Sequence, residues 1–209
     1  MNPDEIAAAL AELGAATLGE TGGRAMRDRI RPAWSGATVI GPAVPVTCTP
    51  GDNLAVHVAV ATAPAGSVLV VDVGDIPELG YWGEVLTTGA QTRGIAGLVI
   101  DGGVRDVAAL EALGFPAFSA TIALRGASKM RPGSVGRRAD VGGVDVELGD
   151  WVVADVDGVV IVPGASIEDV IAEGRARAQK ESHFFDRLRD GATTVELLDL
   201  DATAIDVAL

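Results

Sequence analysis

Cysteine and aromatic residues are scarce in this chain of 209 residues. Cys48 is the only cysteine, so an internal disulfide and a thiolate metal cluster are both excluded, and Cys48 is interpreted as a small core residue. Aromatic residues make up 4% of the sequence and hydrophobic residues 48%, so the expected core is aliphatic. The length suits one domain with a sizeable core, and we expect residues 1–209 to form a single domain.

Positive charge and long apolar runs are also lacking. The chain has 16 Lys and Arg residues against 29 Asp and Glu residues, for a formal net charge of −13. Nucleic acids and anionic membranes are bound by basic surfaces, so we expect neither as a partner. No uncharged run reaches the roughly 18–20 residues of a membrane-spanning helix. The first residues include Asp4 and Glu5 and lack the basic start of a signal peptide, which predicts a cytoplasmic protein.

Strands and helices alternate in the middle of the chain. Residues 67–72 form a continuous apolar run, as expected of a strand that is buried on both faces, and residues 97–101 repeat it. This alternation predicts parallel strands with right-handed crossovers. Strands are expected at 37–41, 44–47, 67–72, 97–101 and 116–119, and helices at 52–62, 83–93 and 106–113.

The two ends of the chain are predicted to be helical. Asn2 is a suitable N-cap and Pro3 a suitable first-turn residue for a helix over 3–18. Residues 24–32 are basic and are expected to be a loop or a short helix. A long charged helix is expected at about 166–188, and the family resemblance described below implies that it contacts a neighbouring subunit.

The second half of the chain carries hairpin signals. Residues 144–146 and 151–154 are expected to flank a turn at 148–150. Asp157-Gly158 is a strong hairpin dipeptide and leads into the apolar run 159–162. These segments predict a β-rich wall, and the whole chain is therefore expected to be an α/β fold.

The first candidate binding element is the helix that is expected to begin at Gly83. The free amide groups and the positive dipole end of a helix start attract a carboxylate, and a glycine there lets a ligand approach the backbone. Most helix starts, however, bind only a capping group or water. Glu84 follows Gly83, and its alternative role is a favourable interaction with the helix dipole.

The second candidate element follows the expected strand at 97–101. Arg105 and Asp106 come just after its C-terminal end, which is the edge where open α/β sheets bind ligands. Arg105 can hold a carboxylate or a keto oxygen with two parallel donors. Asp106 can bind a hard cation such as Mg²⁺, which often keeps several waters. The alternative is a surface ion pair, or Asp106 as a helix cap, and the residues alone leave both readings open.

These two elements carry a resemblance to a known family. Twenty residues separate Glu84 from Arg105-Asp106. This spacing resembles the acid–X20–Arg-Asp signature of the 4-hydroxy-4-methyl-2-oxoglutarate aldolases, the class II pyruvate aldolases of the RraA-like family. The resemblance extends over about residues 25–200. It includes the segments 35–39, 71–72, 82–84, 97–102, 116–118, 149–150 and 154–160 and Pro163.

The resemblance implies a swivelling β/β/α domain with a central parallel or mixed sheet. It also implies a homotrimer or homohexamer with active sites between subunits. The implied reaction is divalent-metal-dependent cleavage of a 4-hydroxy-2-oxo acid to release pyruvate. The substrate would be 4-hydroxy-4-methyl-2-oxoglutarate or 4-carboxy-4-hydroxy-2-oxoadipate, and oxaloacetate decarboxylation is expected as a secondary activity.

The resemblance also assigns roles to individual residues. Asp106 would be the one direct protein ligand to Mg²⁺ or Mn²⁺, and Arg105 would steady the ketone oxygen of the keto acid. Glu84 would orient a metal-bound water, and Glu181 from the C-terminal helix of a neighbouring subunit would assist catalysis. For Glu181 the residues alone favour an ordinary solvated helix face. The expected substrate-binding residues are Gly83, Glu84, Val85, Leu86 and Arg105.

A different class of function is the alternative. The RNase E inhibitor proteins share the implied fold, so the chain could be a non-catalytic regulator of an RNA-processing enzyme. Many of those proteins lack the acid before the spacer and the Asp after the Arg. Both are present here as Glu84 and Asp106, which favours catalysis.

Other reactive side chains would imply different reactions, and the sequence supports those reactions less well. A Schiff-base aldolase would use Lys129 or Lys180, but the glycine-rich surroundings of Lys129 do not predict a desolvated amine. His57 is expected to be packed or partly exposed on its helix, and His183 to face a subunit contact. The tryptophans are interpreted as packing residues, although Trp82 could form a wall of the pocket beside Gly83.

Overall fold

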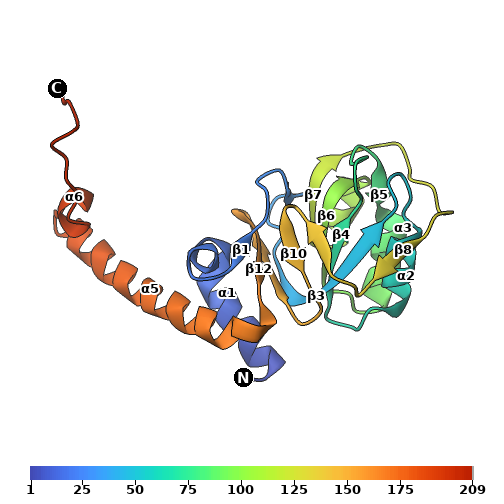
Figure 1. The fold of residues 1–209 in the computed structure, drawn as a ribbon, viewed down its shortest axis with the longest axis horizontal. Coiled ribbons are helices and arrows are strands. Elements are labelled where there is room, and N and C mark those ends of the chain that lie inside the picture. Colours follow the sequence, from blue (N-terminus) through green and yellow to red (C-terminus); the bar gives the residue numbers. More distant parts are fainter. Residues whose placement is uncertain (209) are drawn as a thin grey trace.

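A curled, mixed β-sheet forms the centre of the structure, a computed structural model that describes residues 1–208 (Figure 1). The helices are α1 (Pro3–Glu20), α2 (Leu54–Thr62), α3 (Glu84–Thr92), α4 (Val107–Ala112), α5 (Ile167–Arg189) and α6 (Thr194–Leu197), with a 3-10 turn at Gly164–Ser166. The strands are β1 (Arg24–Ala25), β2 (Arg31–Pro32), β3 (Val39–Cys48), β4 (Val68–Asp72), β5 (Gly80–Trp82), β6 (Gly97–Val104), β7 (Ala117–Ile122), β8 (Gly133–Val135), β9 (Ala139–Val141), β10 (Val144–Val146), β11 (Trp151–Asp155) and β12 (Gly158–Val162).

The sheet combines a parallel half with an antiparallel half. Its strand order is β1-β12-β11-β3-β4-β6-β7-β2, with β5 beside β6 and β8 beside β3. The pairs β3–β4, β4–β6, β5–β6 and β6–β7 are parallel, as the strand and helix alternation predicted. The pairs of β11 with β12 and with β3 are antiparallel and form the expected β-rich wall. The predicted α/β class with a mixed sheet is confirmed.

Strand β3 joins the two halves. Residues 39–42 pair antiparallel with β11, and residues 43–47 pair parallel with β4. The two separate strands expected at 37–41 and 44–47 are therefore one strand, and that expectation was wrong. Pro42 and Pro45 suggested a break, but the fixed φ of proline is compatible with an extended strand, and each proline costs the ladder only one N–H donor.

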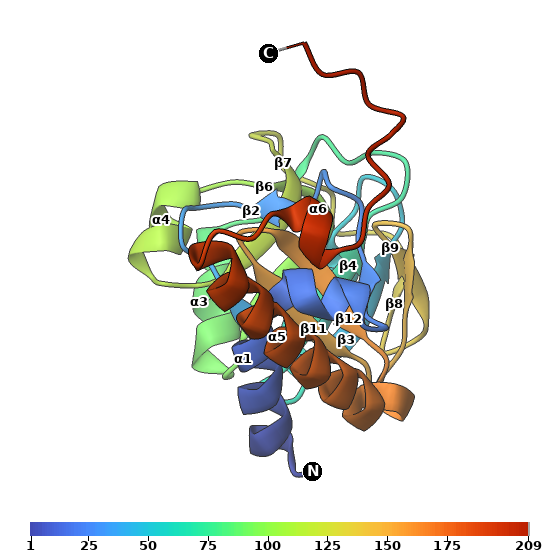
Figure 2. The same cartoon turned by 90° about the vertical axis from the view of Figure 1, so that its left-hand side faces the viewer.

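Three apolar clusters hold the layers of the fold together. In Figure 2 the terminal helices α1 and α5 lie in front of strands β11 and β12. Helices α2, α3 and α4 cover one face of the parallel half, with Val56, Leu86 and Leu110 in that cluster. The opposite face packs against the β-rich wall, including the β9–β10 hairpin. Helices α1 and α5 then pack on the outer side of β11 and β12. This sequence of helices, sheet, wall and terminal helices agrees with the β/β/α domain that the resemblance implied.

Residues 24–32 were expected to be a loop or a short helix; they form two short strands with a loop at 26–30 between them. Strand β1 pairs with β12 and strand β2 pairs with β7, at opposite ends of the sheet. Met26 and Ile30 between them are buried, and the Arg29 guanidinium holds both oxygens of Asp101 at 2.7 and 2.6 Å. Strands of two residues have no local periodicity, so only these tertiary contacts define them.

Strand β10 pairs with β9 and not with β11, which corrects the expected hairpin at 148–150. Gly142 and Gly143, both at positive φ, join β9 to β10 as a two-residue turn. Asp150 instead accepts the amides of Glu147 and Gly164 and directs the chain into β11. The hairpin predicted at Asp157-Gly158 is confirmed between β11 and β12.

Helix α5 extends away from the rest of the chain (Figure 1). Its first half packs on α1 and buries Ile167, Val170, Ile171 and Gly174, whereas none of its residues after Gly174 is buried. The predicted long helix at about 166–188 is confirmed. None of the helices described over residues 1–208 combines the length and apolar character needed to cross a membrane.

Asp52 fixes the loop before β8 against the start of α2. Its side chain is 2% exposed and accepts the amides of Leu54, Met130 and Arg131. Burial alone would raise the pKa of Asp52, but these hydrogen bonds, together with one from the Ser128 side chain, outweigh burial and lower the pKa from 3.8 to about 2. The ionised carboxylate therefore stabilises this loop.

Asp52→Asn should lower the free energy of unfolding at neutral pH by about 1–3 kcal/mol, because buried amides would lose their charged acceptor. The contribution of the wild-type carboxylate is fully present above pH 3.8 and is lost as the pH falls towards 2. Urea unfolding of both proteins at a series of pH values should show a difference that shrinks below pH 3.8. A difference that is constant across this range would contradict the assignment.

Candidate active site

The candidate site lies at the carboxyl edge of β5 and β6. Trp82 pairs with Val104, and the Arg105 amide donates to the Trp82 carbonyl oxygen at 2.9 Å. This pairing sets the residues that follow β5 beside the residues that follow β6. The structure therefore brings Gly83 and Asp106 together, although Gly83 was selected as the start of an expected helix and Asp106 from its position after an expected strand.

Asp106 bridges the two turns through one carboxylate oxygen. Its Oδ2 accepts the Glu84 amide at 3.1 Å and lies 3.7 Å from the Arg105 Nε. Its Oδ1 makes no hydrogen bond to any residue of the described chain, 1–208, and the side chain is 43% exposed. Asp106 occupies the N-cap position of α4 but makes no side-chain cap there, so its carboxylate caps α3 instead. Its backbone is left-handed, at φ 57°, a conformation that Asp and Asn tolerate better than most residues.

Two glycines make this close approach possible. A Cβ on Gly83 would lie 2.5 Å from Oδ2 of Asp106 and 3.1 Å from Cγ of Arg105. A Cβ on Gly80 would lie 2.6 Å from the Ala123 carbonyl oxygen and 3.1 Å from Cδ of Arg105. Gly83 has an extended backbone that any residue can adopt, so space and not conformation requires glycine there.

A small cavity of about 160 Å³ opens between these turns and α2. Glu84 does not line it, although its neighbours on both sides do. A second cavity, of about 270 Å³ between α1 and β12, contains none of the expected site residues. The first cavity is lined by Asn53, His57, Gly80, Tyr81, Trp82, Gly83, Val85, Leu86, Arg105, Asp106, Gly126, Ala127 and Lys129.

The start of α3 supplies free hydrogen-bond donors to this cavity. The Thr87 amide bonds back to the Gly83 carbonyl oxygen at 3.0 Å, and the Glu84 amide is held by Asp106. Within residues 1–208 the amides of Val85 and Leu86 have no acceptor. A carboxylate bound here would meet two amide donors, the positive end of the helix dipole and the charge of Arg105.

The donor set restricts which cation could bind. Among residues 1–208 there is no group of three or more His, Cys, Asp or Glu side chains placed to hold a metal ion. Asp106 therefore offers a single carboxylate with a free Oδ1 beside open space. These donors fit a hard cation such as Mg²⁺ or Mn²⁺, which keeps most of its ligands as water or substrate oxygens, and do not fit a closed zinc cage.

Several residues that line the cavity were not assigned to it from the sequence. His57 was expected to be packed or partly exposed, and it is half-buried and lines the cavity. Asn53 precedes α2 and Lys129 lies in the loop that Asp52 holds. Asn53 follows the carboxyl end of β3, so the edge rule that selected Asp106 could have found it. Lys129 gave no such signal because it lies in irregular structure.

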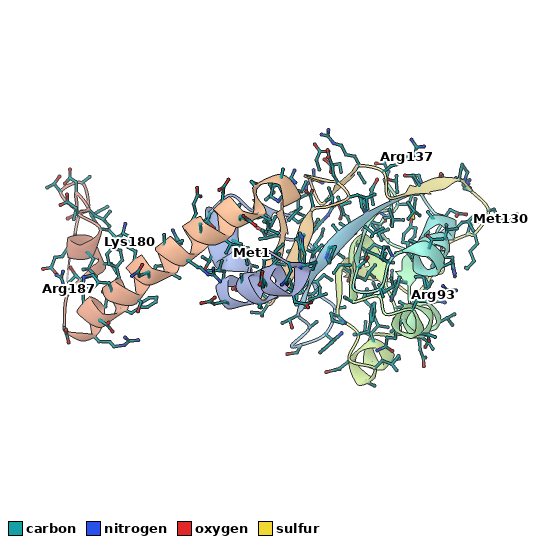
Figure 3. All side chains as sticks on the ribbon, turned by 90° about the horizontal axis from the view of Figure 1, so that it is seen from below. Met1, Arg93, Met130, Arg137, Lys180 and Arg187 are labelled. Carbon is teal, nitrogen blue, oxygen red and sulfur yellow. The ribbon has the colours of Figure 1, made fainter. Side chains whose placement is uncertain are left out.

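Glu181 does not reach this cavity in its own chain. It lies on the distal half of α5 and pairs with Arg177 at 2.9 Å, and Arg177 also pairs with Glu20 of α1. Figure 3 shows its neighbour Lys180 at the opposite end of the molecule from Met130, which is adjacent to Lys129 in sequence. The role of Glu181 stays a prediction that depends on a second subunit.

Three other residues considered from the sequence, Cys48, Trp82 and Lys129, differ in their environments. Cys48 is buried, and burial, followed by the charge of Asp72, raises the pKa of its thiol to about 12, so it is a core residue as expected. Trp82 both packs and lines the cavity: its indole stacks on Phe115 at 5.6 Å and its Nε1 donates to Thr87. Lys129 is exposed, in agreement with the expectation that it is not a desolvated amine.

The fold and the site define a class of protein: an α/β domain with a small cavity, lined by Arg105 and Asp106, at the carboxyl edge of its parallel strands. The sequence matches the family model described as RraA-like, Aldolase/RraA, over residues 7–161. The chain therefore belongs to the RraA-like family, as its acid–X20–Arg-Asp spacing indicated.

Relatives and solved structures agree with this assignment. A protein of Halalkalibacterium halodurans named "Putative 4-hydroxy-4-methyl-2-oxoglutarate aldolase" is 35% identical over 152 residues, covering 73% of this chain and 72% of the relative. An uncharacterized protein from Pseudomonas syringae superposes with a TM-score of 0.84 at 25% identity, covering 94% of this chain and 93% of that one. Streptomyces coelicolor RraAS2, described as an unusual member of the RNase ES inhibitor RraA family, has a TM-score of 0.76 at 28% identity, covering 90% and 100%.

Gly83→Ala should displace the Asp106 carboxylate, because the new Cβ would lie 2.5 Å from its Oδ2. We expect binding of Mn²⁺ and of oxalate, measured by calorimetry, to weaken by at least about tenfold, the equivalent of one lost charged contact. Gly89→Ala on the same helix is the matched control. Its Cβ would meet only Val60 at an ordinary 3.5 Å, so binding should be unchanged and the helix slightly stabilised. Equal binding by both variants would contradict this geometry.

Proposed function

We propose that this chain is a divalent-metal-dependent lyase that cleaves 4-hydroxy-2-oxo acids and releases pyruvate. The observation that carries the proposal is the convergence of Asp106, Arg105 and the free amides of α3 on one small cavity. The aldolase name of the Halalkalibacterium halodurans relative supports the same reaction class. The substrates expected from the family are 4-hydroxy-4-methyl-2-oxoglutarate and 4-carboxy-4-hydroxy-2-oxoadipate.

The chain's own residues bind and polarise the pyruvyl half of the substrate. The amides of Val85 and Leu86 receive the C1 carboxylate, and Arg105 donates to the C2 ketone oxygen. Asp106 would hold a Mg²⁺ or Mn²⁺ ion, and that ion would supply Lewis-acid polarisation of the oxo acid. When the C3–C4 bond breaks, its electron pair forms an enolate whose oxygen carries negative charge. Arg105 stabilises that charge more strongly than it stabilises the neutral ketone, which lowers the barrier.

Proton transfer completes the reaction. The C4 hydroxyl must lose its proton as the C3–C4 bond breaks, and C3 of the enolate must gain one to become the methyl group of pyruvate. Glu84, whose two neighbours in sequence line the cavity, and Glu181 from a second subunit are the acids proposed to accept and return this proton through water. Loss of CO₂ from oxaloacetate leaves the same enolate, so oxaloacetate decarboxylation is proposed as a secondary activity.

Asp106→Asn tests the proposal, because it keeps the side-chain shape and the left-handed backbone but removes the charge that holds the cation. We expect pyruvate release from 4-hydroxy-4-methyl-2-oxoglutarate with Mg²⁺, followed with lactate dehydrogenase, to fall at least about 100-fold. Glu111→Gln, an exposed acid on the same helix α4, should keep full activity. Full activity of wild type after EDTA treatment would sink the metal-dependent mechanism.

We also propose that the chain works as a homotrimer or homohexamer in which Glu181 acts at the site of a neighbour. The distal half of α5 has no buried residue in its own chain and carries exposed Phe185. A helix that leaves its own core in this way is free to pack on a second copy. By the family resemblance, Glu181 occupies the place of the acid on this helix that completes the cavity of a neighbouring subunit.

A complementation experiment tests action in trans. Asp106→Asn and Glu181→Gln should each be nearly inactive as separate oligomers. Mixing equal amounts, with dissociation and reassembly, should restore about one quarter of the wild-type sites, those that combine an intact cavity with an intact Glu181. An untreated mixture of the two oligomers is the control. No recovery after subunit exchange, with exchange shown by mass spectrometry, would argue that Glu181 acts within its own chain or not at all.

A regulatory role is the second candidate function. Streptomyces coelicolor RraAS2 is described as a member of an RNase inhibitor family, and it covers 90% of this chain. Under this alternative the protein would bind an RNase E type enzyme without turning over an oxo acid. Pull-down with RNase E and the pyruvate assay on one preparation separate the two: binding without metal-dependent turnover would favour the regulator.

A further inference from the structure

Gly83 is the one residue between strand β5 and helix α3. Space requires a glycine there, and a glycine restricts its own backbone less than any other residue. The peptide chain at Gly83 therefore does not by itself fix the direction in which α3 leaves the sheet. The free amides of Val85 and Leu86 depend on that direction, so other contacts must hold the start of the helix in place.

Trp82, the last residue of β5, provides such a contact from inside the core. Its indole Nε1 donates to the Thr87 hydroxyl oxygen at 2.7 Å, and the two residues are 1% and 0% exposed. The Thr87 amide donates to the Gly83 carbonyl oxygen at 3.0 Å. One side-chain bond and one backbone bond thus tie the start of α3 to the end of β5.

The indole of Trp82 is also held by Phe115. The two rings stack with 5.6 Å between their centroids and 13° between their planes. The Phe115 carbonyl oxygen in turn accepts from Nε1 of Trp34 at 2.9 Å. Phe115 follows α4, the helix that begins after Asp106. Trp82 therefore contacts the start of α3 and the segment after α4, the two helices on either side of the cavity turns.

The bond between Trp82 and Thr87 is costly to break. Within residues 1–208 the indole Nε1 makes no other hydrogen bond, and a buried donor without a partner is unfavourable. The fold therefore resists rotations at Gly83 that would separate the two side chains. Asp106 holds the Glu84 amide of the same turn, but Asp106 is 43% exposed and is the proposed cation ligand. The Trp82 contact does not involve the cation.

We propose that Trp82 and Thr87 are positioning residues for the carboxylate-binding amides of α3. The bond between their side chains sets the direction of the start of α3, and with it the aim of the Val85 and Leu86 amides at the C1 carboxylate. Neither side chain takes part in breaking the C3–C4 bond. This inference rests on the proposed function, because that function places the pyruvyl half of the substrate at Arg105 and α3.

Thr87→Val is the direct test, because valine keeps the shape of threonine without the hydroxyl and Thr87 does not line the cavity. We expect KM for 4-hydroxy-4-methyl-2-oxoglutarate to rise by about fivefold or more, since misplaced amides bind the substrate and the transition state less well. The value of kcat should change less than about twofold. Thr92→Val is the matched control on the same helix: its hydroxyl donates to the Thr88 carbonyl oxygen inside α3, so KM should be unchanged.

Thr87→Ser separates positioning from stability. Serine keeps the hydroxyl but loses a buried methyl group, so this variant should melt at a lower temperature than wild type while its KM stays within about twofold. Trp82→Phe removes the donor and keeps a ring for the stack on Phe115, so it should raise KM as Thr87→Val does. Adding Thr87→Val to Trp82→Phe should raise KM no further, because both changes remove the same bond.

Oxalate, which mimics the enolate of pyruvate, gives a readout without turnover. Its dissociation constant with Mg²⁺, measured by calorimetry, should rise in Thr87→Val and stay unchanged in Thr87→Ser. An unchanged KM in folded Thr87→Val and Trp82→Phe, or KM values that follow the melting temperature through Thr87→Ser as well, would overturn the inference. Wild-type protein that releases no pyruvate would overturn the proposed function. Oxalate binding would then decide the inference, which fails if wild type and Thr87→Val bind oxalate equally or not at all.

Discussion

The pairing of β5 with β6 is the interaction on which the site depends. It is short, and its last hydrogen bond runs from the Arg105 amide to the Trp82 carbonyl oxygen. That bond sets the direction of the chain on both sides, towards α3 after β5 and towards α4 after β6. Gly80 and Gly83 leave room for the side chains of Arg105 and Asp106 beside β5, because a Cβ on either glycine would collide with one or both of them. The Asp106 carboxylate, the Arg105 guanidinium and the free amides of α3 are thus positioned by one small piece of sheet.

Much of this arrangement could be read from the sequence, for a physical reason. The buried strands β4 and β6 are apolar on both faces, and ligands in such sheets bind beyond the carboxyl ends of the strands. Residues such as Asp106 could therefore be selected from position alone. The pairings of β1, β2 and β10 could not, since strands of two or three residues are defined by tertiary contacts. The place of His57 at the cavity also lay outside sequence reasoning, because it depends on how α2 packs against the site.

The two halves of α5 have different environments, and this difference bears on the proposed role of Glu181 at a neighbour's site. Ile167, Val170 and Ile171 anchor the first half on α1 and the β-rich wall. The second half holds Glu181 in a charged contact with Arg177, away from the cavity of its own chain. Exposed ion pairs of this kind contribute little to stability, so exchanging this contact for one at a neighbour's site would cost little. Oligomer assembly and completion of the site would then be one event.

The backbone of Asp106 lets one carboxylate cap a helix and keep an oxygen free for the proposed cation. A left-handed conformation outside glycine carries a cost, and it persists only where the surroundings enforce it. Here it turns the carboxylate away from α4, which it would normally cap, and towards the start of α3. Oδ2 then holds the Glu84 amide while Oδ1 stays without a hydrogen bond in residues 1–208. A cation on Oδ1 would leave the contact to α3 intact, so the anion-binding amides would stay in position whether or not the cation is bound.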